Sequence, residues 1–404
     1  PPGEEIGGLG GASAVLEAAL EQARAGAASA SAGPPRRPGV QVVGLDLDTL
    51  PTACTMCPGT IALDGYCTDC GAPAARPRDH WAEQPAAWVA LVCDRGLRHT
   101  VNQDGGAIAA TDQPGEFVAM VVCDGVSSAA RSEVASLAAA RAARDVLAAP
   151  RPVPGGAAPE PGPGAAPAVD PIPVPAPSAP QDGPPVGLAA PSTSVQSHSS
   201  VLAAAVREAG AAAQDQAVAA AADPPERNPP ACTFVGAVLD GTTLVTGWVG
   251  DSRAYWLPDD GVPVQLSTDD SWAAEAIALG FSREQAERAP QAHSITRWLG
   301  VDAPDPVPRT AARRVQGPGW LLLCSDGLWN YASEAADLRD LVAGTAAATG
   351  GRPLALAEAL VAWANAQGGH DNITVALARI GPAVSEPSGT AATAGAGTDG
   401  SDPD

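Results

Sequence analysis

The chain has 404 residues, a formal net charge of −22, and a high content of proline (41) and glycine (44). So large an acidic excess repels nucleic-acid phosphates, which argues against a DNA- or RNA-binding role for the protein as a whole. No apolar run reaches the roughly eighteen residues of a membrane span, and no basic segment precedes an apolar one at the N-terminus. We therefore expect a cytoplasmic protein without a membrane anchor. The sequence starts at Pro1, which leaves open whether its N-terminus is complete.

Composition divides the chain into segments. Proline, alanine and glycine dominate the first part and a long internal stretch, and proline at that density prevents both helices and strands. We expect a flexible segment over residues 1–50 with a short helix near 14–24, a cysteine motif over 51–75, a main domain over 86–380 interrupted by a disordered insertion over 151–197, and a disordered acidic tail over 381–404.

The cysteine motif contains two CxxC pairs in the run CTMCPGTIALDGYCTDCG. Four thiolates this close suit one tetrahedral Zn²⁺, which would supply the folding energy that so short a segment cannot obtain from a core. With every ligand position filled, such a site is structural. A redox dithiol and an unmetallated loop are the alternatives. The predicted zinc ligands are Cys54, Cys57, Cys67 and Cys70.

Apolar and alternating runs predict the elements of the main domain in order. Strands over residues 86–93 and 116–123 precede a helix that Ser132 can cap and that extends to about Ala148. We then expect a helix over 200–222, an antiparallel meander from 232, a helical surface section over 269–299, a strand at GWLLLC, a helix over 352–366, and a last strand that ends near 380.

Three Asp-Gly pairs come after apolar runs in this domain. Asp240-Gly241 lies between two β-rich runs, the pattern of a two-stranded hairpin. Asp124-Gly125 and Asp326-Gly327 instead lead from a strand into helical periodicity, which makes their carboxylates candidates for metal ligands.

Four carboxylates adjoin predicted strands. If these groups converged they would repel one another unless cations were bound, and an all-oxygen site favours Mg²⁺ or Mn²⁺. A two-metal hydrolase site is one interpretation, and scattered surface carboxylates are the other. The four are Asp104, Asp124, Asp326 and Asp371.

A series of motifs resembles the metal-dependent protein phosphatase family, protein phosphatase 2C. From about residue 88 to 380, without the insertion, the motifs are DRGLRHTVNQD, VVCDGVSS, CTFVGAVLDGTTLVTGWVGDSRAYWL, LSTDDSW, ITRWLG, LLLCSDGLW and GGHDNITVALARI. The cysteine motif resembles ribbons fused to such phosphatases in actinobacteria. The resemblance implies an α+β fold, a four-layer α-β-β-α sandwich of two antiparallel sheets flanked by helices, preceded by a small zinc ribbon.

The resemblance also implies roles for individual residues. Asp124 would bridge two Mn²⁺ or Mg²⁺ ions, with the carbonyl of Gly125 as a further ligand, and Asp104, Asp326 and Asp371 would complete the centre. A hydroxide held between the ions would attack the phosphorus of phosphoserine or phosphothreonine. The family's phosphate-binding arginine aligns with His99, next to Arg98, and Asp251 and Asp269 match positions that hold a third metal in bacterial members.

Two further departures from the family pattern concern the metal surroundings. Gln103 replaces a common glutamate, and Val126-Ser127-Ser128 replaces a His-Gly-Gly or Met-Gly-Gly run, so a proposed histidine acid is absent. His370 is an alternative acid.

We interpret the chain as a protein serine/threonine phosphatase acting on phosphorylated proteins, including serine/threonine kinases and their substrates. We expect a monomer that binds neither nucleic acid nor membrane. The alternatives are a pseudophosphatase acting as a regulatory or binding module, and an interaction protein whose working part is the ribbon.

Overall fold

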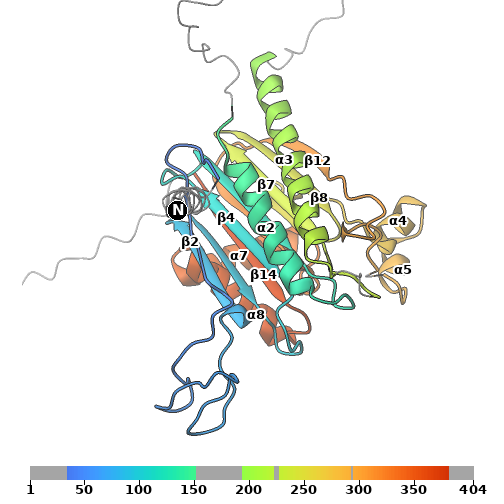
Figure 1. Ribbon diagram of the computed structural model, residues 1–404. Helices are drawn as coiled ribbons and strands as arrows, with labels where there is room; N and C mark the ends of the chain where they lie inside the picture. Colours follow the sequence, from blue (N-terminus) through green and yellow to red (C-terminus); the bar gives the residue numbers. More distant parts are fainter. Residues whose placement is uncertain (1–33, 152–192, 223–226, 293, 382–404) are drawn as a thin grey trace, which may run out of the picture.

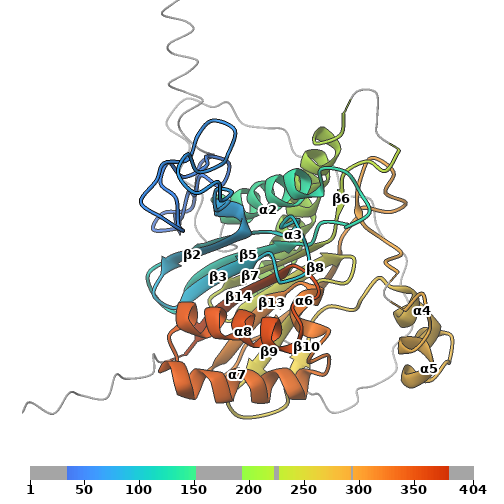
Figure 2. The ribbon, with the colours of Figure 1, turned by 90° about the horizontal axis from the view of Figure 1, so that it is seen from below.

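The computed structural model describes residues 34–151, 193–222, 227–292 and 294–381. The helix expected near 14–24, most of the insertion and nearly all of the tail lie outside these ranges. Two six-stranded antiparallel sheets form the centre of the described part, in the orders β1-β4-β5-β7-β8-β12 and β10-β9-β13-β14-β3-β2. Figures 1 and 2 show the sheets stacked face to face with helices outside them.

The strands of the first sheet are β1 (Gln41–Val42), β4 (Gly105–Ala110), β5 (Phe117–Cys123), β7 (Phe234–Asp240), β8 (Thr243–Val249) and β12 (Arg309–Arg314). Those of the second are β2 (His80–Ala86), β3 (Val89–Asp94), β9 (Arg253–Pro258), β10 (Val264–Gln265), β13 (Gly319–Cys324) and β14 (Ile373–Ile380). A short pair joins β6 (Ala231–Cys232) to β11 (Leu299–Gly300).

Helices cover the outer face of each sheet. The helices α2 (Ser132–Ala148) and α3 (Thr193–Ala219) pack on the first, and α7 (Ala335–Thr349) and α8 (Pro353–Gln367) on the second. Short helices η1 (Pro77–Asp79) and α6 (Asp326–Trp329) lie next to strands, whereas α4 (Trp272–Ala278) and α5 (Arg283–Glu287) project from the body (Figures 1 and 2). The predicted four-layer sandwich is therefore confirmed.

The hydrophobic core has three layers, as this architecture requires. Ile108, Met120 and Leu321 belong to the layer between the sheets. The layer under α2 and α3 is rich in alanine, which lets these helices approach the sheet closely, and Leu356 and Leu360 anchor α8 on the other side. The inner strands, such as β5 and β13, are buried on both faces, so their sequences read as continuous apolar runs.

Several sequence-based expectations need correction in the described part. Within the predicted flexible segment, β1 pairs with β4, and Leu47 is buried. The helix α3 begins at Thr193, inside the predicted insertion. Ser132 does not cap α2: Arg131 is the cap residue, and the Ser132 hydroxyl donates to the carbonyls of Val126 and Ala129. Strands β1, β2, β4, β10 and β12 were not predicted. Short or charged edge strands carry little alternation, and β4, although buried between β1 and β5, has the sequence GGAIAA, whose glycines and alanines are weak strand formers.

Candidate metal centre

The ends of four central strands bring the predicted carboxylates to one end of the sandwich. Asp104 directly precedes β4 and Asp124 comes directly after β5, and these antiparallel strands pair at Gly105 and Cys123. In the other sheet, Asp326 lies just after β13 and Asp371 just before β14, which are also antiparallel neighbours. Each sheet therefore contributes two of the four carboxylates.

A buried carboxylate joins the two sheet ends. One oxygen of Asp104, Oδ2, accepts hydrogen bonds from the hydroxyls of Ser325 at 2.8 Å and Thr374 at 2.7 Å, both on the second sheet's side. Sequence reasoning missed both hydroxyl residues. The sequence feature that could have identified them is their position next to the predicted metal ligands, in CSDG and DNIT. They fix the Asp104 carboxylate through Oδ2 and leave its other oxygen, Oδ1, without a donor among the described residues.

The electrostatics of this cluster are unfavourable without a cation. Burial, and after it the charges of Asp104 and Asp326, raises the pKa of Asp124 well above its ordinary value. Burial, and after it the charges of Asp251 and Asp371, does the same to the pKa of Asp326. Asp104 is fully buried, and burial is the main reason that its pKa rises from 3.8 to about 7. These carboxylates disfavour ionisation because they lie near one another and are half-buried or, for Asp104, fully buried.

Two carboxylate oxygens in the cluster have unmet bonding capacity. The Oδ1 atoms of Asp104 and Asp326 are shielded from water and have no hydrogen-bond partner among the described residues. A buried anionic oxygen without a donor is costly, and a hard divalent cation would satisfy it. The donor set, made of oxygens only, fits Mg²⁺ or Mn²⁺.

Close backbone contacts explain the glycines after the two strand-end aspartates. A Cβ atom on Gly125 would lie 2.4 Å from the carbonyl oxygen of Gln103, and one on Gly327 would lie 2.0 Å from that of Asn372. Only glycine allows the loops that carry the carboxylates to approach so closely. In contrast, Asp240 pairs with Thr243 at the β7–β8 turn, which confirms the predicted hairpin.

The two residues predicted for a third metal differ from each other. Asp251 is buried, and its pKa rises to about 7 through burial and the charge of Asp269. Asp269 is held by Arg253, with 2.6 Å between Nη2 and Oδ2, and Arg253 stacks on Trp329. The structure thus places Asp251 with the acidic cluster, whereas the carboxylate of Asp269 has a guanidinium partner.

A cavity of about 460 Å³ opens beside Asp251. Its walls come from β10, from the loop before α4, from α4 itself and from the end of α6, including Gln265, Thr268, Ile277 and Asn330. Asn330 also donates to Asp326 Oδ2 at 3.0 Å. The cavity therefore borders the acidic cluster at Asp251 and Asn330.

The predicted phosphate-binding pair lies on the loop after β3. The Nε2 atom of His99 is 3.2 Å from Oδ1 of Asp371, so this side chain reaches the cluster. Arg98 is exposed, and its backbone N–H donates to the carbonyl of Gly369. His370, the alternative acid, is also exposed, and its backbone N–H donates to the hydroxyl of Tyr331.

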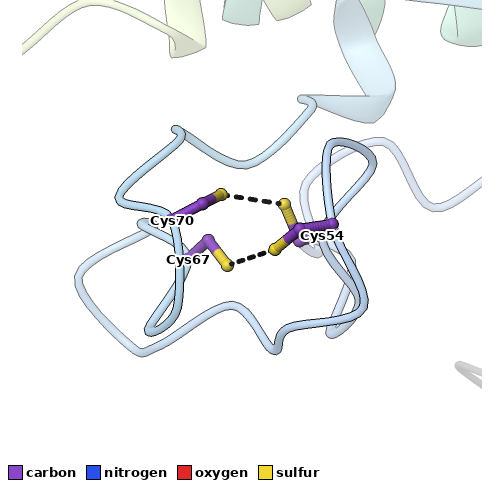
Figure 3. A group of neighbouring side chains, drawn as sticks. Cys54, Cys67 and Cys70 are labelled. Carbon is purple, nitrogen blue, oxygen red and sulfur yellow. Dashed lines mark hydrogen bonds between the residues drawn. The ribbon is translucent and has the colours of Figure 1, made fainter.

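The cysteine motif forms a separate cluster at the predicted ligands. Its sulfur atoms all lie within 4.8 Å of one another, and the pairs Cys54–Cys70 and Cys57–Cys67 are 3.7 and 3.5 Å apart (Figure 3). A tetrahedron with Zn–S bonds of about 2.3 Å spaces its sulfurs by about 3.8 Å. Backbone N–H groups, first that of Cys70, lower the pKa of the Cys67 thiol to about 7, whereas the pKa values of the Cys57 and Cys70 thiols are raised, so four thiolates can coexist here only with a bound cation. The geometry is compatible with a zinc ribbon.

Comparison with known proteins identifies the family. The model of the family described as Protein phosphatase 2C matches residues 97–364, more than half of the chain. The chain belongs to the protein phosphatase 2C family. The serine/threonine phosphatase stp of Listeria innocua is 37% identical over 147 residues, which cover 36% of this chain and 55% of the relative. The protein phosphatase PhpP of Streptococcus pneumoniae is 36% identical over 143 residues, covering 35% and 54%.

The aligned regions are partial: the chain spans about half the length of the curated relatives it matches. Among solved structures, the serine/threonine phosphatase Stp1 from Staphylococcus aureus superposes with a TM-score of 0.52 at 22% identity, covering 73% of this chain and 95% of that one. At this identity the superposition supports the phosphatase 2C fold and nothing more specific. Within the described ranges, no helix combines the length and apolar character needed to cross a bilayer.

Proposed function

We propose that this protein is a metal-dependent serine/threonine phosphatase that hydrolyses phosphoserine and phosphothreonine in other proteins. The observation that carries the proposal is a set of neighbouring carboxylates at the joined ends of the two sheets, whose charges raise one another's pKa and two of whose oxygens lack a hydrogen-bond partner among the described residues. Family membership supports the choice of phosphoryl transfer among the reactions that such a site could perform. The named relatives are phosphatases.

The metal ligands in this proposal are carboxylates from both sheets and one carbonyl: Asp104, Asp124, Asp326, Asp371 and the carbonyl of Gly125. When bound, two Mn²⁺ or Mg²⁺ ions supply Lewis acidity at the phosphoryl group and lower the pKa of a water molecule toward neutrality. Asp251 is the residue best placed to take part in a third site, because Arg253 already neutralises Asp269.

The remaining residues bind and orient the substrate. His99 borders the cluster through Asp371 and donates a hydrogen bond to a phosphate oxygen, while Arg98, on the same exposed loop, adds a positive charge that attracts the phosphate. The cavity beside Asp251 accepts the side chain that carries the phosphate together with its neighbours in the substrate. The substrates are cytoplasmic phosphoproteins, among them serine/threonine kinases, and the phosphatase acts as a monomer.

The ribbon in this proposal holds one structural Zn²⁺ through its four thiolates. Elemental analysis of the purified chain should give about one zinc per molecule, and a protein without zinc would contradict this assignment. The ribbon and the acidic cluster bind different metals in this proposal, because thiolates select zinc whereas carboxylates select Mg²⁺ or Mn²⁺.

Hydrolysis of p-nitrophenyl phosphate and of a phosphothreonine peptide tests the proposed reaction. We expect turnover that requires added Mn²⁺, stops with chelator, and falls at least about a hundredfold in Asp326→Asn, since one ligand loses its charge. Asp240→Asn is the matched control, because that aspartate also precedes glycine but lies in a hairpin. Metal-independent turnover, or none in a folded wild type, would overturn the proposal, and the second result would favour a pseudophosphatase.

A further inference from the structure

One arginine outside the proposed site connects the ribbon to the loop that carries Asp104. Arg78 lies in η1, between the ribbon and β2. Its Nε donates to the carbonyl of Asn102 at 3.0 Å and its Nη2 to that of Asp104 at 3.1 Å. Nη2 also donates to the carbonyl of Glu133 in the first turn of α2. The guanidinium therefore holds together the Asp104 loop and the start of a helix.

The loop before Asp104 also binds the backbone of Arg78. The side-chain amide of Asn102 donates to the carbonyl of Arg78 at 2.9 Å, and its side-chain oxygen accepts from the backbone N–H of Asp104 at 3.2 Å. Asn102 is 1% exposed, so these bonds form in a dry environment. Arg78 and Asn102 together fix the backbone on both sides of Gln103, which sets the direction of the Asp104 carboxylate.

The partners of the Arg78 guanidinium are carbonyl and hydroxyl oxygens instead of a carboxylate. Burial lowers the pKa of Arg78, because a charge without a counter-ion loses hydration. The planar fork of arginine can donate to several carbonyls at once, a geometry that lysine cannot reproduce. Such an arrangement serves to position backbone groups accurately.

The other side of Arg78 is tied to the ribbon through a short connection. The ribbon's last backbone hydrogen bond runs from the N–H of Ala74 to the carbonyl of Gly65, only four residues before Arg78. After Arg78, the carbonyl of Asp79 accepts from the N–H of Arg95 at 2.8 Å, which fastens η1 to the loop after β3. The ribbon itself protrudes from the body beside β2 (Figures 1 and 2).

We propose that Arg78 is a positioning residue for the divalent-metal centre, and that the zinc-filled ribbon acts through it to raise the affinity of that centre for Mn²⁺. This inference rests on the proposed function, because it assumes that Asp104 binds a metal. The ribbon restricts η1, η1 holds Arg78 in place, and Arg78 holds the Asp104 loop in its metal-binding geometry.

Mn²⁺ binding to the full-length, zinc-containing chain tests the role of Arg78, measured by titration calorimetry and by the electron paramagnetic resonance signal of free Mn²⁺. Residues that orient metal ligands typically change affinity by tenfold or more, so we expect Arg78→Met to weaken binding by roughly tenfold. The Mn²⁺ affinity of Arg78→Lys should lie between those of the wild type and Arg78→Met. Arg76 is an exposed neighbour, so Arg76→Met should bind Mn²⁺ as the wild type does.

A purely structural role predicts a different pattern. In that case Arg78→Met would lower the melting temperature of the metal-free protein but leave its Mn²⁺ affinity unchanged, which would overturn the inference. If Arg78→Met does not fold, Arg78→Lys and Arg78→Gln decide the question by the same comparison. A folded wild type that binds no Mn²⁺ would instead contradict the proposed function.

The part played by the ribbon is tested by a double-mutant cycle. Replacing Cys54 and Cys57 by serine removes zinc, and we expect it to weaken Mn²⁺ binding in the wild-type background by several-fold. In the Arg78→Met background the same replacement should weaken Mn²⁺ binding little further, since the connection from the ribbon to the Asp104 loop is already broken. Additive losses, or no loss from the ribbon variant alone, would overturn the coupling.

Discussion

A buried glutamate in β2 makes the pH dependence of stability predictable. Glu83 is 1% exposed, and its Oε2 accepts a hydrogen bond from the backbone N–H of Ile108 at 3.2 Å, while Oε1 has no partner among the described residues. Burial is the main cause that raises the pKa of Glu83 from 4.5 to about 7, and the Ile108 bond and Arg144 offset it only in part. Glu83→Gln keeps the acceptor and removes the titration.

The order of ionisation in the two states sets the sign of the effect. Because the pKa of Glu83 is higher in the folded state, the unfolded chain loses this proton first, and the free energy of unfolding falls as the pH rises from about 4.5 to about 7. At 1.36 kcal/mol per pH unit, the cost grows by about 2.5 kcal/mol between pH 5 and pH 8. The glutamine variant avoids this cost, so its stability relative to the wild type should rise by that amount.

Urea unfolding of both proteins at pH 5 and pH 8, without divalent metal, measures the effect. Subtracting the free energy of unfolding of the wild type from that of the variant at each pH removes the contribution of the aspartates, which titrate in both proteins. Glu116→Gln, at an exposed glutamate before β5, is the control and should show no such change with pH. A stability difference for Glu83→Gln that is constant with pH, or that shrinks toward pH 8, would refute the reasoning.

The remaining predictions concern the two metal sites and their surroundings. Asp124→Asn should abolish Mn²⁺-dependent hydrolysis yet raise the melting temperature of the metal-free protein by a few degrees, because it removes a half-buried carboxyl group whose ionised form the neighbouring aspartates repel; a lower melting temperature would contradict this. His99→Arg should lower KM for a phosphopeptide roughly threefold or more, as a bidentate donor replaces an imidazole, and an unchanged KM would argue against phosphate binding at this position. Cys67→Ser should lose the zinc measured by elemental analysis, and retention of zinc would exclude this ligand. Gly327→Ala should destabilise the fold by about 3 kcal/mol in urea unfolding, since its Cβ would lie 2.0 Å from the Asn372 carbonyl oxygen.

Local patterns predicted the parts of the candidate site that depend on neighbouring residues. The Asp-Gly pairs differ in the element that comes after them: Asp240 lies in a hairpin, whereas Asp326 leads into α6. The CxxC spacing likewise predicted a compact sulfur cluster, because the cysteines of each pair are close in sequence. The roles of the carboxylates as metal ligands stay a prediction.

Contacts between distant segments could not be predicted in this way. Ser325 and Thr374 reach Asp104 across 221 and 270 residues of sequence, and Arg78 reaches the carbonyl of Glu133 across 55. No local periodicity encodes such pairs, because they depend on how the two sheets stack. The two-residue strand β1 also carries too little pattern to distinguish it from the loop around it.

β1 and Glu83 both cover the edge of β4 in the first sheet, and this affects solubility. An edge strand with free backbone groups can pair with another molecule, and proteins block such edges with short strands and inward-pointing charges. Here β1 pairs with Ala109 and Ala110 of β4, and Glu83 occupies the N–H of Ile108 in the same strand. Shortening the chain to the region that matches the family model, which starts at residue 97, would remove β1 and Glu83 together with β2 and β3 of the second sheet. The apolar strand GGAIAA would then be open to edge-to-edge aggregation.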